Sequence, residues 1–211
     1  MKGFVFSLVT THHTNDPAHR PLLSRWAVVV VLLCSLCSGC STIISAFSPD
    51  PIQRNPGKRT FGAVIDDEQI ETISYVNLDK GSEALADAHI SVTSYNGVVL
   101  LTGQVSSKDL RREASQIISD ITKVRQVHNE LQVQGTTSFL ARTNDTWLTT
   151  KVKTRLLANE DINGRRIKVV TESGVVYLMG LLSRVEAEQA AEVVRTTGGV
   201  QKVVTAIEYI D

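Results

Sequence analysis

The feature that most constrains the fold of this chain is an internal repeat. The stretch ISVTSYNGVVLLTGQVSSKD, residues 90–109, aligns without gaps on IKVVTESGVVYLMGLLSRVE, residues 167–186. Farther along, Ala114 matches Ala191, and Leu131 matches Ile207 once one residue is dropped from the second copy. Upstream, DDEQIETISYVNL lies opposite NDTWLTTKVKTRLL, so each copy spans about 70 residues. Any fold of this chain must therefore use the same unit twice.

The pattern inside one copy predicts the order helix, strand, strand, helix, strand. In the second copy we expect Asp145 to be the N-cap of the first helix, because Leu148, Val152 and Leu156 then recur as one apolar stripe. Two β-branched runs, an Ala-rich amphipathic segment and an alternating segment follow. The prediction is an α+β fold, αββαβ in each copy, with a small three-stranded mixed sheet and two helices on one face. The first domain is expected over residues 65–135 and the second over residues 136–211.

Glycines recur at the same places in both copies. Asn96-Gly97 and its counterpart Ser173-Gly174 divide the two β-branched runs, and Asn-Gly is a strong signal for a two-residue hairpin turn because both residues tolerate positive φ. Structural turns and close packing account for Gly97, Gly103, Gly174 and Gly180. Their spacing matches no phosphate-binding loop, and no acid pair or Ser/His/Asp set recurs in both copies. The sequence therefore predicts no enzyme, no catalytic residue and no cofactor.

The first part of the chain has the pattern of an export signal. WAVVVVLLCSL, residues 26–36, is an uncharged apolar run, too short for the roughly 20 residues of a membrane-spanning helix. Arg20 and Arg25 precede it and the small residues Ser38 and Gly39 follow it, as in a signal peptide. We expect residues 1–39 to be that signal. Because the polar stretch before the run is long for a signal, we also expect translation to start downstream of Met1.

All three cysteines of the chain, Cys34, Cys37 and Cys40, lie at the end of this segment. Their spacing suggests a metal site, but the first two are in an apolar stretch and the chain has no fourth cysteine. Ser38-Gly39-Cys40 instead resembles a bacterial lipobox, with Cys37 where leucine is usual. The resemblance implies that Cys40 is lipidated and becomes the mature N-terminus, and that Ser41 after it favours the outer membrane. Residues 40–64, with Pro49, Pro51 and Pro56, then form a tether.

The repeat, with G-V-V-x-L-x-G in both copies, resembles the BON domain, a small αββαβ module of bacterial envelope proteins. Two copies behind a lipobox resemble the dual-BON outer-membrane lipoproteins of the DolP type, relatives of the periplasmic OsmY-type proteins. The most similar stretches are NDTWLTTKV, residues 144–152, and ESGVVYLMGL, residues 172–181. The resemblance implies a non-enzymatic, lipid-anchored protein that faces the periplasm, binds phospholipid through the second copy and supports outer-membrane integrity.

The first helices of the two copies differ in charge, which the fold does not require. DDEQIETISYVNLDK of the first copy holds five acidic residues and one lysine, whereas TWLTTKVKTRLL of the second holds three basic residues and no acid. Trp147, Lys151 and Arg155 recur at i, i+4 and i+8, so they form one stripe beside the apolar face. A tryptophan with cations suits an anionic lipid surface, although the same residues are also compatible with a packing tryptophan and a solvated face. The family resemblance points to Trp147.

Two functional hypotheses remain from the sequence. The first is a protein that binds anionic phospholipid membranes through Trp147, Lys151 and Arg155. The second is a protein-interaction adaptor or chaperone with partners in envelope assembly or cell-wall remodelling. Nucleic acid is not an expected partner, because Lys+Arg and Asp+Glu balance at 22 each.

Overall fold

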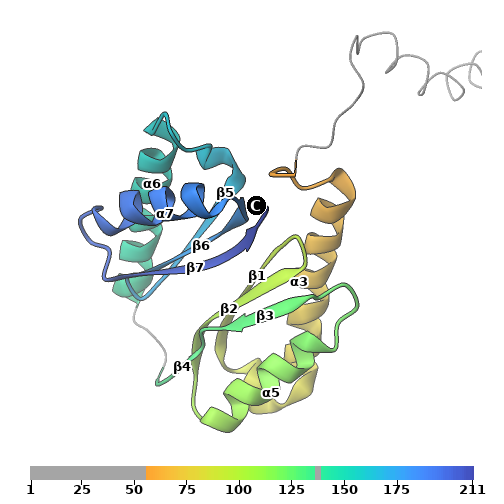
Figure 1. The fold of residues 1–211 in the computed structure, drawn as a ribbon. Coiled ribbons are helices and arrows are strands. Elements are labelled where there is room, and N and C mark those ends of the chain that lie inside the picture. Colours follow the sequence, from red (N-terminus) through yellow and green to blue (C-terminus); the bar gives the residue numbers. More distant parts are fainter. Residues whose placement is uncertain (1–55, 136–138) are drawn as a thin grey trace, which may run out of the picture. The chain divides into compact units, whose positions relative to one another are not determined.

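Each repeat of the chain folds into a mixed β-sheet with helices packed against one of its faces (Figure 1). The computed structural model describes residues 56–135 and 139–211. Both repeats lie within one compact unit, residues 54–211. The expected α+β class and the αββαβ order are confirmed.

The first repeat begins with a helix of 21 residues, α3, and contains two short elements that the sequence did not predict, α4 and β4. Its elements are α3 (Phe61–Gly81), α4 (Glu83–Ala86), β1 (His89–Tyr95), β2 (Val98–Val105), α5 (Lys108–Ser119), β3 (Gln126–Asn129) and β4 (Gln132–Val133). Helix α3 starts inside the stretch predicted to be the tether, where the Thr60 hydroxyl accepts a hydrogen bond from the Ala63 N–H as the N-cap.

The second repeat follows the same order with a short 3₁₀ turn added before its first strand. Its elements are α6 (Phe139–Ala158), the turn η1 (Gly164–Arg166), β5 (Ile167–Glu172), β6 (Val175–Leu182), α7 (Arg184–Arg195) and β7 (Lys202–Tyr209). Ser183 and Glu186 form a capping box at the start of α7.

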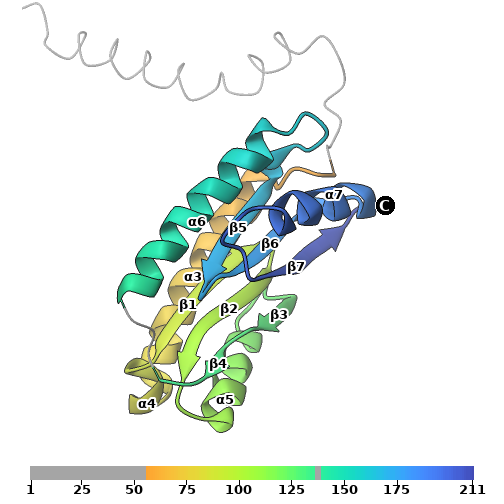
Figure 2. The ribbon, with the colours of Figure 1, turned by 90° about the vertical axis from the view of Figure 1, so that its left-hand side faces the viewer.

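The sheet topology is the same in both repeats (Figure 2). The hairpin strands pair antiparallel, β1 with β2 and β5 with β6, and the third strand pairs parallel with the second strand of the hairpin. In the first repeat the third strand is divided into β3 and β4, both of which pair with β2. The second repeat has a single continuous third strand, β7.

Helices and sheet enclose one hydrophobic core in each repeat. The predicted stripe of the second repeat is confirmed: Leu148, Val152 and Leu156 are at most 1% exposed and belong to a core cluster with residues of β5, β6 and α7. Ile70 and Leu78 of α3 occupy the equivalent positions in the first core cluster. Each apolar side chain buried in this way stabilises the fold by about 1.5–3 kcal/mol. This burial explains why α6 packs against the sheet although its outer face is polar.

The hairpin turns form where they were expected. Asn96 and Ser173 have φ of 54° and 51°, and the glycines that follow them both have φ of 76°. Gly103 and Gly180 instead lie within β2 and β6, opposite Ile90 and Ile167. A Cβ atom at Gly103 would lie 2.0 Å from the His89 carbonyl oxygen, so close packing rather than a turn requires glycine there.

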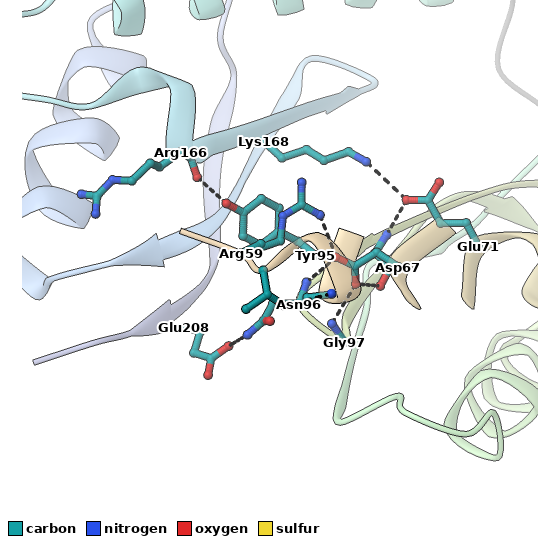
Figure 3. Close-up of polar contacts among 12 residues, drawn as sticks. Arg59, Asp67, Glu71, Tyr95, Asn96, Gly97, Arg166, Lys168 and Glu208 are labelled. Atoms are coloured by element: carbon teal, nitrogen blue, oxygen red, sulfur yellow. Dashed lines mark hydrogen bonds and ion pairs between the residues drawn. The ribbon is translucent and has the colours of Figure 1, made fainter. Parts of the chain in front are cut away.

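Asp145 is not the N-cap of its helix, contrary to the sequence prediction. Helix α6 starts at Phe139, and Asp145 is a buried residue within it that accepts hydrogen bonds from the N–H groups of Ser173 and Gly174, at 2.7 and 2.8 Å. Asp67 has the same role in the first repeat, where it binds the N–H groups of Asn96 and Gly97 (Figure 3). Each aspartate therefore holds the first helix against the hairpin turn.

The faces of the two sheets that the helices leave uncovered contribute to a third cluster. It contains Tyr95, Val98 and Leu100 of the first repeat and Tyr177, Met179, Leu181 and Ala206 of the second. Hydrogen bonds lie beside it. The Tyr95 hydroxyl donates to the Arg166 carbonyl at 2.9 Å (Figure 3). The buried Gln104 amide donates to Glu172 at 2.6 Å. The two repeats thus share buried side chains in addition to their separate cores.

Candidate membrane-binding surface on helix α6

Trp147 lies on the outer face of α6 and is 58% exposed. Its neighbour Leu148 is fully buried, so the amphipathic pattern of the helix turns the indole toward solvent. The packing role that was the alternative for this tryptophan is therefore not what the structure shows. At the equivalent position the first repeat has Gln69.

Lys151 lies one turn along the helix and contacts the indole. Its ammonium nitrogen is 4.8 Å from the centre of the Trp147 ring, within the range of a cation–π interaction. The same ammonium donates a hydrogen bond to the Gly198 carbonyl at 2.8 Å. Trp147 and Lys151 therefore lie on one stripe of the helix, as their spacing predicted, and the loop after α7 holds the lysine in place.

Arg155 lies one turn farther along the helix. Its spacing suggested an exposed position on the same stripe as Trp147 and Lys151, but its guanidinium contacts the end of α7. Its guanidinium donates to the Thr196 carbonyl at 2.8 Å and to the Thr197 hydroxyl at 3.1 Å. Thr196 is the C-cap of α7, where unpaired carbonyls accumulate. The sequence did not reveal this contact, because it joins residues that are far apart along the chain. Arg155 therefore stabilises the end of α7 in addition to contributing charge.

The positive charge of this surface is not compensated by acidic partners. Among the described residues, no salt bridge involves Lys151, Lys153 or Arg155, and residues 146–158 contain no acid. In α3 of the first repeat, by contrast, Asp66 pairs with Lys123 and Glu71 pairs with Lys168. The equivalent helices thus present charges of opposite sign.

Threonines make the outer face of α6 less polar than its composition suggests. The hydroxyls of Thr146, Thr150 and Thr154 each donate to the helix carbonyl four residues earlier, at 2.9–3.1 Å. These donors do not need water, so moving them into a lipid interface costs less than moving free hydroxyls. These threonines were not among the predicted site residues, although their spacing of four residues is visible in the sequence.

Two further exposed residues of α6 lie on another side of the helix. Leu157 is 58% exposed, and Lys153, one turn before it, is exposed as well. At 100° per residue, Leu157 is about 80° around the helix from Trp147, on the side away from Lys151. Leu157 therefore provides a comparison residue of equal exposure on the same helix.

Other types of site find no support among the described residues. No group of three or more His, Cys, Asp or Glu side chains there is arranged to hold a metal ion, and no helix there is long and apolar enough to cross a membrane. Cys34, Cys37 and Cys40, and with them the predicted signal and lipidation site, lie outside the described residues.

The two αββαβ modules define the class of protein: a tandem-module α+β protein whose repeats keep one fold and differ in surface charge. The chain belongs to the BON domain family, whose model matches residues 66–135 and again residues 144–211. The family suggested by the sequence is therefore confirmed.

Several relatives are similar over most of the folded region. A protein named 21 kDa hemolysin from Actinobacillus pleuropneumoniae is 36% identical over 152 residues, which are 72% of this chain and 78% of the relative. Outer membrane lipoprotein DolP from Haemophilus influenzae is 35% identical over 153 residues, 72% of this chain and 79% of the relative. Osmotically-inducible protein Y from Escherichia coli is 32% identical over 117 residues, 54% of this chain and 58% of the relative.

Proposed function

We propose that this protein is an outer-membrane lipoprotein of the bacterial envelope, facing the periplasm, that binds anionic phospholipids through α6 of its second BON domain. It has no enzymatic role in this proposal and supports the integrity of the outer membrane. Two kinds of support meet here. The similarity to a DolP named as an outer membrane lipoprotein covers most of the folded region. In addition, Ser38-Gly39-Cys40, before the expected tether, resembles a lipobox.

The single observation that carries the lipid-binding proposal is the exposed Trp147 with the Lys151 ammonium against its ring. An indole is favoured at the level of the lipid head groups, and each nearby cation contributes about 1 kcal/mol of attraction to an anionic leaflet. The uncompensated charge of Lys153 and Arg155 adds to this attraction. The acyl anchor would keep α6 near the bilayer, so that even a weak contact is occupied much of the time.

Co-sedimentation with anionic vesicles tests this site. Trp147→Ala is expected to weaken binding about tenfold, because an interfacial aromatic anchor is lost, and to leave the fold intact, because the side chain is exposed. The matched control is Leu157→Ala, which removes an equally exposed apolar side chain about 80° away around the same helix, on the side away from Lys151. Equal binding by Trp147→Ala and the parent protein would remove α6 from the proposal.

A further inference from the structure

The first repeat has an apolar groove that its fold does not require. Helix α4 follows the end of α3 (Figure 2), and these two helices and the start of β1 border the groove. Its volume is about 380 Å³, within the range of pockets that hold ligands. The second repeat has only the 3₁₀ turn η1 between its first helix and first strand, and the pocket there is lined mostly by polar residues. The groove is therefore a property of the first repeat alone.

The floor and one rim of the groove are apolar. Leu78 and Leu85 line it and are at most 4% exposed, so they form its floor. Tyr75 and Val76 of α3 also line it and are 47% and 45% exposed. Exposed apolar surface that gathers around a hollow marks a place where another molecule binds. The occupant must therefore bring apolar groups of its own.

Acidic side chains surround the groove. Asp79 lines it, and Glu83 and Asp87 are the first residue and the C-cap of α4. All three are exposed, and none forms a salt bridge with another described residue. Lys80 is the only lysine or arginine among residues 75–90. The rim therefore attracts a cationic partner and repels an anionic membrane or a nucleic acid.

The strand beside the groove is closed to the addition of another strand. β1 lies at the edge of its sheet, but side chains of α3 accept hydrogen bonds from its N–H groups. The Val92 N–H donates to the Tyr75 hydroxyl at 3.1 Å, and the Ser94 N–H donates to the Glu71 carboxylate at 2.8 Å. An extended peptide would need these groups for pairing, whereas a helix satisfies its own backbone and needs only side-chain contacts.

We propose that this groove, bounded by Val76, Asp79 and Leu85, binds a basic amphipathic α-helix of another protein. The apolar floor fits the apolar stripe of such a helix. The acidic rim fits lysine or arginine side chains that flank the stripe, and the closed edge of β1 favours a helix over a strand. The first repeat then binds a protein, in addition to any membrane contact that the second repeat makes.

Helix α6 of a second copy fits this groove less well, although it is basic. Its apolar stripe of Leu148, Val152 and Leu156 is buried in its own core. Its exposed apolar side chains Trp147 and Leu157 lie about 80° apart around the helix, so they do not form one stripe. The charge and shape of the groove therefore favour a different protein as the partner.

Fluorescence anisotropy of a labelled synthetic helix tests this inference. The probe is a peptide of about 14 residues, built from leucine and lysine with the apolar period of a helix. The protein is the mature lipoprotein in nanodiscs of neutral phosphatidylcholine, with empty nanodiscs as the blank. We expect binding in the micromolar range that weakens as salt is added. A peptide of the same composition without an apolar face, and one with glutamate in place of lysine, should each bind at least about tenfold more weakly.

Matched substitutions on α3 locate the probe. We expect Val76→Gln to weaken binding about tenfold and Asp79→Asn about threefold, because the groove loses an apolar contact or a charge. Both side chains are exposed, so the fold should be retained. The controls are Ile65→Gln and Glu68→Gln, which remove an exposed apolar residue and an exposed acid about three turns earlier on the same helix. They should leave the binding unchanged.

The inference is overturned if Val76→Gln and Ile65→Gln bind the probe equally, because the groove is then not the site. It is also overturned if the peptide without an apolar face binds as tightly as the probe. A second copy is the occupant instead if crosslinking in the envelope gives a dimer of the parent protein that Val76→Gln abolishes. A membrane is the occupant if Val76→Gln weakens binding to anionic vesicles as much as Trp147→Ala does.

Discussion

At the scale of single residues, one buried aspartate in each repeat determines how the first helix meets the sheet. Asp67 accepts hydrogen bonds from the Asn96 and Gly97 N–H groups, the Ser94 hydroxyl and Arg59. Asp145 likewise accepts hydrogen bonds from two backbone N–H groups of its turn. Without the carboxylate, these N–H groups of the hairpin turn would be partly buried and unpaired, because the hydrogen bonds between the strands do not reach them. The carboxylate therefore provides the acceptor that they need.

Removing either aspartate should destabilise its repeat strongly. We expect Asp67→Ala and Asp145→Ala each to lower the free energy of unfolding by about 3 kcal/mol, because buried N–H groups lose a charged acceptor. Urea unfolding measures the change. Asp66→Ala is the matched control, since it removes a neighbouring acid whose pair with Lys123 is largely exposed, and should cost less than about 1 kcal/mol. Similar losses for Asp66 and Asp67 would contradict this role.

The stability of the protein should also depend on pH through Asp67. Burial alone would raise the pKa of its carboxyl, but the hydrogen bonds from Gly97, Ser94, Asn96 and Arg59 outweigh burial and hold the pKa below its ordinary value. The unfolded chain then binds the proton more readily than the folded chain. The stabilisation is therefore complete above about pH 4, the ordinary value, and is lost as the pH falls through the lower folded pKa.

Urea unfolding at pH about 7, 4 and 3 measures this dependence. The parent protein should lose stability at the lowest pH, and Asp67→Ala should lose less over the same interval, because its share of the effect is already absent. Identical pH profiles for the two proteins would show that another group is responsible.

At the scale of elements, the sequence predicted what local patterns determine. The apolar period of four residues placed Leu148, Val152 and Leu156 correctly, and the Asn-Gly and Ser-Gly pairs placed both hairpin turns. Asp145 was misplaced because aspartate before an apolar stripe has the same local pattern as an N-cap. Only the contact with a turn 28 residues away distinguishes the two roles.

Two features could not be predicted from the sequence, because they depend on contacts between segments that are distant along the chain. These are the broken third strand of the first repeat and the surroundings of α6. The buried Leu131 lies in the gap between β3 and β4, whereas its aligned partner Ile207 lies within the continuous strand β7. Likewise, the helical spacing correctly brought Trp147 and Lys151 together. It could not show that Arg155 reaches the end of α7, because the Thr196 carbonyl is distant in sequence. Periodicity therefore predicts a stripe but not what the stripe contacts.

At the scale of the whole folded region, the two BON domains pack against each other through buried side chains from both repeats. Tyr95 and Leu100 pack in one cluster with Tyr177 and Met179, and all four are at most 7% exposed. The Gln104–Glu172 hydrogen bond is buried in the same region. Separating the repeats would expose this apolar surface and leave polar groups unpaired, so each repeat should stabilise the other.

The repeats should consequently unfold together. Trp147 is the only tryptophan after residue 40, so its fluorescence reports on the second repeat, whereas far-ultraviolet circular dichroism reports on both. We expect the two signals to give one coincident transition in urea, as in a two-state protein. Two separated transitions would mean that the shared cluster contributes little to stability.

The central claim, that α6 brings this protein onto anionic membranes, is tested most directly by the fluorescence of Trp147 in the mature lipoprotein. We expect a blue shift on addition of vesicles rich in phosphatidylglycerol, and quenching by lipids brominated near the head groups, because the exposed indole enters the interface. Neutral phosphatidylcholine vesicles should give a much smaller response, since they lack the charge that attracts Lys151 and its neighbours. An unchanged spectrum with anionic vesicles, or an equal response to both lipids, would show that α6 does not bind anionic membranes.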